Sequence, residues 1–285
     1  MPKKSSEKNK TAVKGGSASK TASKKIDPKK ILAGATLTGS LLLTPASQKL
    51  KGLPDKPPEL RIPYGLISGQ ELKKLLAELL KKILPKSSRV LTEKEEELLT
   101  QVIQKTLGIK AVAQLDGNRL NHQIGMMGLE QHLMRYPGDT SLAGRPFPQA
   151  GIAPGKGAWG YWVPSRAQLA KTDVEMEKYY VAVQTLYLPD WKVRLRELRD
   201  WYKYRKVLII NPQNGAAVVA VIADAGPAKW TGKQFGGSPQ LMHDLGLYPK
   251  RTKGKTIILF IDDPDNKVPL GPIDHPLTTE RPKRV

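Results

Sequence analysis

The segment from residue 206 to residue 223 constrains the fold of this chain more than any other part of its sequence. It consists of Lys206-Val-Leu-Ile-Ile210, Asn211-Pro-Gln-Asn-Gly215 and Ala216-Ala-Val-Val-Ala-Val-Ile-Ala223. An Asn-Gly pair between two apolar, β-branched runs predicts a hairpin turn between two strands. The second run has no polar residue on either face, so we expect it to be a central strand of a closed barrel.

Other stretches of the C-terminal half have the composition of strands or helices. β-Branched and aromatic residues fill 179–187, and a second apolar stretch, 256–261, follows Gly254. Both are predicted strands, because such side chains favour extended structure. The run of small and aromatic residues over 158–163 is a third predicted strand. Helices are predicted around 173–178 and, with an amphipathic pattern, over 191–204.

The order of motifs after the hairpin is characteristic. Asp224-Ala-Gly-Pro227 ends the apolar strand, Ser238-Pro239 opens a short helix, and Leu245-Gly246-Leu247 precedes the last strand. This succession resembles the barrel of rare-lipoprotein-A-like cell-wall proteins, and at lower resolution it is similar to expansin barrels and some lytic transglycosylases. The resemblance covers about residues 155 to 263. It implies a six-stranded double-psi β-barrel, a peptidoglycan or related polysaccharide ligand, and Asp224 as the acid or base of glycan cleavage.

The chain also departs from the pattern of that family. Gly236-Gly237 stands where the family has a second Asp, Ala225 replaces an Arg, and no His follows the opening strand. Glycosidic cleavage commonly needs two cooperating carboxyl groups, or one acid with help from the substrate. Whether the chain is an enzyme therefore stays open, and a turn-capping role for Asp224 is the alternative. The candidates for a second carboxyl group are Asp173, Glu175, Glu177, Asp262 and Asp263.

A sugar-binding barrel presents flat aromatic rings, because the apolar face of a pyranose stacks on them. Trp230 is the first candidate, since it lies in a predicted loop just after Asp224, and loops on rigid scaffolds carry binding groups. The lysines of that loop favour an anionic ligand, and paired glycines let a ligand approach the backbone. Trp159 and Trp162, three apart on a strand, cannot share one face, so at least one is expected in the core. The predicted ligand-binding residues are Trp230, Lys229, Lys233, Gly236, Gly237, Trp159 and Tyr161.

The N-terminal part differs from this half in composition. The formal net charge is +21, from 47 Lys and Arg against 26 acidic residues, and residues 1–30 alone hold ten lysines. We expect 1–30 to be a disordered basic tail, because it cannot bury enough apolar surface to offset the entropy of ordering. The uncharged segment 31–47 follows basic residues and ends in small ones, which is typical of a signal peptide and predicts export. A buried or surface helix is the alternative. Residues 48–66 are predicted to form a proline-rich linker.

A helical region is predicted over 67–150. Capping boxes at Ser68-Gly-Gln-Glu71 and Thr92-Glu-Lys-Glu95 each open a helix with apolar residues at helical spacing, which predicts a helical hairpin packed on the barrel. The alternative is that the first helix lies on a membrane surface through Lys73, Lys74, Lys81 and Lys82. A third, short helix is expected over 126–135, with Glu130, His132 and Arg135 lining a groove. For His132 a structural role is the default, because no metal-ligand spacing accompanies it.

Absent motifs exclude several function classes. The chain has no cysteine, which rules out disulfides, thiol catalysis and cysteine-ligated zinc. No phosphate-binding loop, dinucleotide fingerprint or zinc signature is present, so we expect no cofactor and no metal. The positive charge suits polyanions, including an anionic membrane surface, whereas nucleic acid is disfavoured because no reading motif is present.

These observations predict an α+β protein with a C-terminal double-psi β-barrel over 151–265, an N-terminal helical hairpin, a disordered basic tail and an extended tail over 266–285. We expect an exported cell-envelope protein that binds, and under one reading cleaves, peptidoglycan glycan strands. The alternative function is a non-catalytic glycan- or protein-binding module tethered by its basic tail, and the alternative location is the cytoplasm. The oligomeric state does not follow from the sequence.

Overall fold

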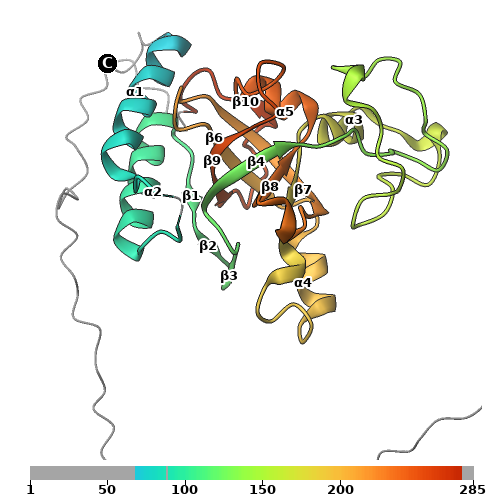
Figure 1. The fold of residues 1–285 in the computed structure, drawn as a ribbon, viewed down its shortest axis with the longest axis horizontal. Coiled ribbons are helices and arrows are strands. Elements are labelled where there is room, and N and C mark those ends of the chain that lie inside the picture. Colours follow the sequence, from blue (N-terminus) through green and yellow to red (C-terminus); the bar gives the residue numbers. More distant parts are fainter. Residues whose placement is uncertain (1–67, 88, 278–285) are drawn as a thin grey trace, which may run out of the picture. The chain divides into compact units, whose positions relative to one another are not determined.

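Six strands close on themselves to form a mixed β-barrel (Figure 1). The computed structural model describes residues 68–87 and 89–277 of the chain. The predicted tail 1–30, signal-like segment 31–47 and linker 48–66 lie outside the described residues, as does the end of the 266–285 tail. The barrel strands are β4 (Ile124–Leu129), β5 (Tyr180–Val183), β6 (Lys206–Ile210), β7 (Ala217–Ala225), β8 (Phe235–Gly237) and β9 (Lys253–Ile261).

The strands follow one another around the barrel in the order β6, β7, β5, β8, β4, β9 and back to β6. Two neighbouring pairs, β4–β8 and β5–β7, are parallel. The other four pairs are antiparallel. Three short additions lie outside this ring: β1 (Ala111–Val112) pairs with β9, β10 (Gly271–Pro272) pairs with β7, and β2 (Gln114–Leu115) pairs with β3 (Asn118–Arg119).

The helices begin where the sequence places their caps. Ser68 and Thr92 each form the expected capping box at the start of α1 (Gly69–Ile83) and α2 (Glu93–Leu107). Ser68 accepts from the backbone N–H of Glu71, and Thr92 from that of Glu95, so orphan amides of the first turn are satisfied. None of the helices in the described part is long and apolar enough to cross a membrane. The remaining α-helices are α3 (Lys171–Lys178), α4 (Leu195–Tyr202) and α5 (Pro239–Asp244).

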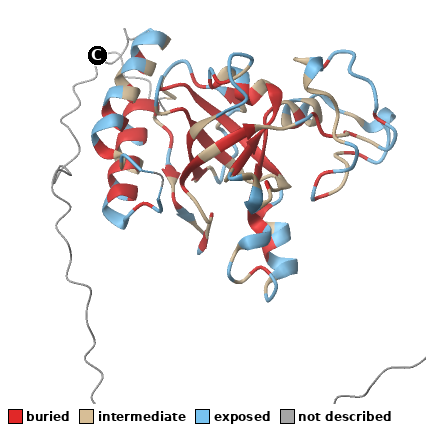
Figure 2. Ribbon diagram, in the orientation of Figure 1, coloured by how far each residue is buried: buried red, intermediate tan, exposed pale blue. Residues whose placement is uncertain are grey.

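Successive side chains of a strand point to opposite faces of the sheet, and this explains why β6, β7 and β9 are apolar throughout. Leu208 and Ile210 of β6 belong to a core cluster with α1 and α2, whereas Val207 and Ile209 belong to a cluster with β5 and β8. Both faces of these strands are therefore buried, as the unbroken apolar runs predict (Figure 2). The apolar side of α1 packs into the first cluster, so it is not the side that would meet a membrane.

Three sequence predictions are corrected by the strand assignments. Residues 126–129 belong to β4 and not to a short helix, so the barrel begins N-terminal to residue 151. Gly125 and Gly128 lack the side chains that would collide with Gln234 and Lys233, and this lets β4 lie flat against its neighbours. The run 158–163 forms turns with a single bridge between Gly157 and Gly160. Extended structure over 179–187 stops at Val183, and a 3-10 turn follows over Thr185–Tyr187.

Candidate functional site

Asp224 lies near the end of β7 and is half-buried. Its Oδ1 accepts hydrogen bonds from the backbone N–H groups of Ala158 and Ala225, both at 2.9 Å. The carboxylate therefore fastens the turn around Ala158 to the barrel, which is the bracing role foreseen as the alternative to catalysis. Its other oxygen, Oδ2, has no hydrogen-bond partner among the described residues, so it is available to a ligand or to water.

A row of small residues crosses the barrel wall next to Asp224. In the strand registers Gly128 of β4 is opposite Gly236 of β8, Gly236 is opposite Ala182 of β5, and Ala182 is opposite Asp224. Because these neighbours carry at most one methyl group, longer side chains have room to lie across them. A Cβ atom at Gly236 would stand 2.2 Å from Oε1 of Glu130, so glycine is required there for Glu130 to lie where it does.

Glu130 is the carboxyl group that the structure brings to Asp224. It directly follows β4, and its backbone N–H donates to the carbonyl of Gly237 at 2.8 Å. Its side chain is 30% exposed and its Oε1 lies 3.6 Å from Nζ of Lys233. Burial raises the pKa of Glu130, and the negative charge of Asp224 adds to this, while the ammonium group of Lys233 opposes it.

Tyr180 lies close to both carboxyl groups. Its hydroxyl group donates to the carbonyl of Gln131, which fixes the chain just after Glu130. Burial raises the pKa of Tyr180 strongly, and the charges of Glu130 and Asp224 raise it further. The phenol therefore stays protonated and keeps its hydrogen bond to Gln131.

The loop between Asp224 and Lys233 carries the exposed Trp230. The side-chain amide of Gln184 donates to the carbonyls of Pro227 and Lys233 at 2.9 and 3.0 Å, which holds both ends of this loop. Trp230 is 89% exposed, as expected of a ring that meets a ligand. The ammonium group of Lys229 lies 4.7 Å from the ring centre of Tyr187, which no sequence motif marks as a site residue.

Other predicted ligand-binding residues serve the fold. Trp159 is buried, and its indole N–H donates to the carbonyl of Arg199 at 2.7 Å. Tyr161 is half-exposed in the turn region. The space beside Gly236 is filled by Glu130, and a Cβ atom at Gly237 would meet Met127 and Met242. The two glycines thus make room for protein side chains, whereas we had expected them to let a ligand approach.

The predicted partners of Asp224 are engaged elsewhere. Asp173 accepts from the backbone N–H of Ala170, and Glu175 pairs with Lys178. Glu177 is buried and pairs with Arg145 at 2.6 Å. Asp262 and Asp263 pair with Lys110 and Lys206.

His132 and Arg135 were expected to line a groove with Glu130, yet both are buried in an ionic network. His132 lies 3.1 Å from Glu177 and 2.8 Å from the carbonyl of Pro146. Arg135 and Arg145 both pair with Asp139, at 2.7 and 2.5 Å. These contacts hold the 130–146 segment in place, so the structural role favoured for His132 agrees with its surroundings.

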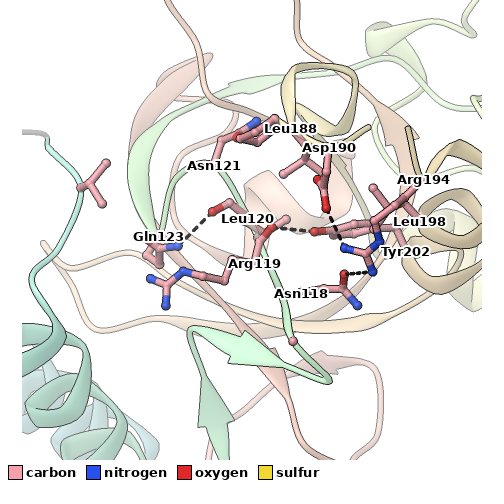
Figure 3. Close-up of a pocket in the computed structure, with 13 residues that line it drawn as sticks. Asn118, Arg119, Leu120, Asn121, Gln123, Leu188, Asp190, Arg194, Leu198 and Tyr202 are labelled. Carbon is pink, nitrogen blue, oxygen red and sulfur yellow. Dashed lines mark hydrogen bonds and ion pairs between the residues drawn. The ribbon is translucent and has the colours of Figure 1, made fainter. Parts of the chain in front are cut away.

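A separate hollow of about 510 Å³ lies between the 118–123 and 188–202 segments (Figure 3). No predicted site residue lines it. Gln123 donates to the carbonyl of Leu120 at 3.1 Å, and its side-chain oxygen has no partner within the described part of the chain. Asp190 at its edge is paired with Arg194 at 2.6 Å, so its carboxylate is already engaged.

Comparison with protein-family models and with curated protein sequences returned no match for this chain. Within residues 68–87 and 89–277 no group of three His, Asp or Glu side chains is arranged to hold a metal ion. The candidate site thus consists of two carboxyl groups, a lysine, a phenol and an exposed indole.

Proposed function

We propose that this chain is an exported cell-envelope protein whose barrel binds and cleaves the glycan strands of peptidoglycan or a related polysaccharide. The observation that carries the proposal is the association of Glu130 with Asp224 across the row of small residues. The two parallel strand pairs within a six-stranded ring support a barrel of the double-psi type, as do the Asp224-x-Gly-Pro227 and Ser238-Pro239 motifs. Export rests on the signal-like segment 31–47.

Glycan cleavage needs an acid that protonates the leaving oxygen while positive charge develops on the sugar. Glu130 suits the acid, because burial and the charge of Asp224 favour its protonated form. Asp224 is the second group: its free Oδ2 stabilises the positive sugar or accepts a proton from the attacking hydroxyl group. This assignment transfers the acid from Asp224, where the family resemblance places it, to Glu130.

The surrounding residues suit a carbohydrate that carries carboxylates. Trp230 offers an uncovered aromatic face for a pyranose ring. Lys229 and Lys233, on either side of Trp230 in this loop, attract the carboxylates of muramic acid and its peptide. Because these groups lie on one loop next to Asp224, a bound strand reaches the carboxyl pair.

The test is to incubate the purified full-length protein with isolated cell-wall sacculi and to analyse soluble products by mass spectrometry. We expect glycan fragments from the wild type and a fall of about 100-fold or more for Glu130→Gln and for Asp224→Asn, as for loss of an acid or base. Glu175→Gln, which changes an exposed carboxylate paired only with Lys178, is the matched control. Fragments that persist in both site variants would contradict the assignment.

The second candidate is a module that binds glycan without cleaving it. The contact between Lys233 and Glu130 favours this reading, because the ammonium group opposes protonation of the carboxylate. In that case the wild type sediments with sacculi and releases nothing, and Trp230→Ala weakens the sedimentation while Glu130→Gln leaves it intact.

A further inference from the structure

Exposed large hydrophobic side chains gather on one short stretch of the described chain. The described residues include seven such side chains, and four of them lie between residues 186 and 195: Leu186, Tyr187, Val193 and Leu195. Val193 is 87% exposed, Leu186 54% and Leu195 47%. Single exposed aliphatic residues are ordinary on a protein surface, but several within ten residues, here on a 3-10 turn, a turn and the start of α4, indicate an interaction site.

This stretch is held firmly while its apolar side chains point outward. Leu198 and Tyr202 anchor α4 in the core, and the Tyr202 hydroxyl group donates to the carbonyl of Arg119 at 2.6 Å. Arg194 bonds both Asp190 and Glu197, which ties the loop to the first turn of the helix. The exposure of Val193 is therefore a property of an ordered element. Figure 1 shows α4 and this loop projecting from the barrel, and Figure 2 shows them largely exposed.

Residues 190–200 hold four cations and three acidic residues, and those without an ion pair in the described part of the chain are mainly positive. Because Arg194 uses both neighbouring carboxylates, Lys192, Arg196 and Arg199 are left without an acidic partner in the described part of the chain. All three are exposed. Asp200 is the single acidic residue of α4 that takes part in no ion pair described here. The aliphatic side chains are thus flanked by three cations and one acidic residue that take part in no ion pair of the described residues.

We propose that this 186–199 face, defined by Leu186, Val193, Leu195, Lys192, Arg196 and Arg199, docks on an anionic phospholipid bilayer. Aliphatic side chains gain free energy when they enter the boundary between headgroups and acyl chains, and cations gain when they meet lipid phosphates. A glycan strand is a poorer match, because Val and Leu offer no flat ring for stacking and the ammonium group of Lys229 lies over the ring of Tyr187. The proposal goes beyond the glycan-cleaving function and uses none of its residues.

A binding measurement alone does not test the proposal, because the ten lysines of residues 1–30 attract anionic vesicles as well. The readout must therefore report the surroundings of the 186–199 face. Since the chain has no cysteine, a single Val193→Cys substitution allows an environment-sensitive fluorophore to be attached at that position only. Leu142→Cys is the matched control, because Leu142 is also an exposed large hydrophobic residue but lies in another loop.

The labelled full-length proteins are mixed with vesicles of phosphatidylglycerol and phosphatidylcholine, or of phosphatidylcholine alone. We expect a blue shift and quenching by spin-labelled acyl chains at position 193 with the anionic vesicles, and neither effect at position 142. In the unlabelled chain, Val193→Ser with Leu195→Ser should lower partitioning by about tenfold. Lys192→Gln with Arg196→Gln should make the partitioning of the chain depend less on the anionic lipid.

Three results overturn the proposal. The first is sedimentation with anionic vesicles while the fluorophore at position 193 remains in water. The second is an equal response to phosphatidylcholine alone. The third is a response at position 193 to sacculi and none to vesicles, which assigns the face to glycan or wall-protein binding. Glycan cleavage by the Val193→Ser, Leu195→Ser variant should equal that of the wild type, so failure here is distinguishable from failure of the cleavage proposal.

Discussion

At the scale of single residues, Glu130 shows how the barrel changes the chemistry of a side chain. It directly follows β4, and Gly236 of the neighbouring strand β8 leaves the space in which its carboxyl group lies partly buried near Asp224. Burial and like charge both disfavour ionisation, which is how paired carboxyl groups come to differ in acidity. The charge of Lys233 makes the rise in the pKa of Glu130 smaller but does not reverse it.

This raised pKa has a consequence for stability. The folded chain binds a proton at Glu130 more tightly than the unfolded chain, whose ordinary value is 4.5. The free energy of unfolding therefore falls as the pH rises from 4.5 through the pKa of the folded state. Above that pKa the loss of stability has reached its full size. Glu130→Gln removes this cost, so we expect the variant to be more stable than the wild type at pH 7.

Urea denaturation between pH 4 and pH 8 measures this effect. The advantage of Glu130→Gln should shrink as the pH falls toward 4.5 and be absent below it, where the carboxyl group is protonated in both states. The control is again Glu175→Gln. An advantage that grows toward low pH would show that ionised Glu130 stabilises the fold.

At the scale of elements, the turn between β6 and β7 is a docking point for other parts of the chain. Asn211 and Asn214 each donate to the carbonyl of Leu245, just after α5. Gly215 has a φ of 72°, and a Cβ atom there would stand 1.8 Å from the backbone oxygen of Lys73 in α1. Glycine is thus needed for its conformation and also for the close approach of α1.

Gly215→Ala and Gly117→Ala separate these two requirements. Gly117 has a similar φ of 77° but no neighbour within 4 Å of its would-be Cβ atom. Both variants should lose about 1–2 kcal/mol from left-handed backbone strain. Gly215→Ala should lose about 1–3 kcal/mol more, because α1 must move. If chemical denaturation shows equal losses of unfolding free energy for the two variants, α1 moves away from position 215 without destabilising the fold.

At the scale of the whole molecule, α1 and α2 complete the barrel's core. Their buried residues share a cluster with Leu208, Ile210, Ile257 and Leu259, which occupy the faces of β6 and β9 that the other cluster leaves uncovered. Without the helices these side chains would meet water as one large apolar patch, which monomeric proteins rarely carry. The helices are therefore part of the same folding unit as the strands.

Truncation tests this dependence. A chain that begins at Ile109 should aggregate or lose its cooperative thermal transition, because the apolar face of β6 and β9 is exposed. A chain that begins at Ser68 keeps both helices and should unfold at the wild-type temperature. Circular dichroism with size-exclusion chromatography distinguishes the two. A monomeric fragment from Ile109 with an unchanged transition would contradict the shared core.

Elements whose signals are local could be predicted from the amino-acid sequence. The capping boxes at Ser68 and Thr92 set the starts of α1 and α2, and the Asn-Gly turn with unbroken apolar runs predicted β6, β7 and a closed barrel. These predictions succeeded because a cap or a turn acts within a few residues. Ser238, which accepts from the backbone N–H of Leu241 at the start of α5, is another example.

Tertiary structure alone decided the features that depend on distant residues. Residues 126–129 have helix-compatible spacing, yet they form β4 because β8 and β9 supply hydrogen-bond partners and the glycines admit their side chains. Glu130 meets Asp224 through the register of four strands, which no local pattern encodes. A strand's partner and register are set by long-range pairing and burial, and only the folded barrel provides them.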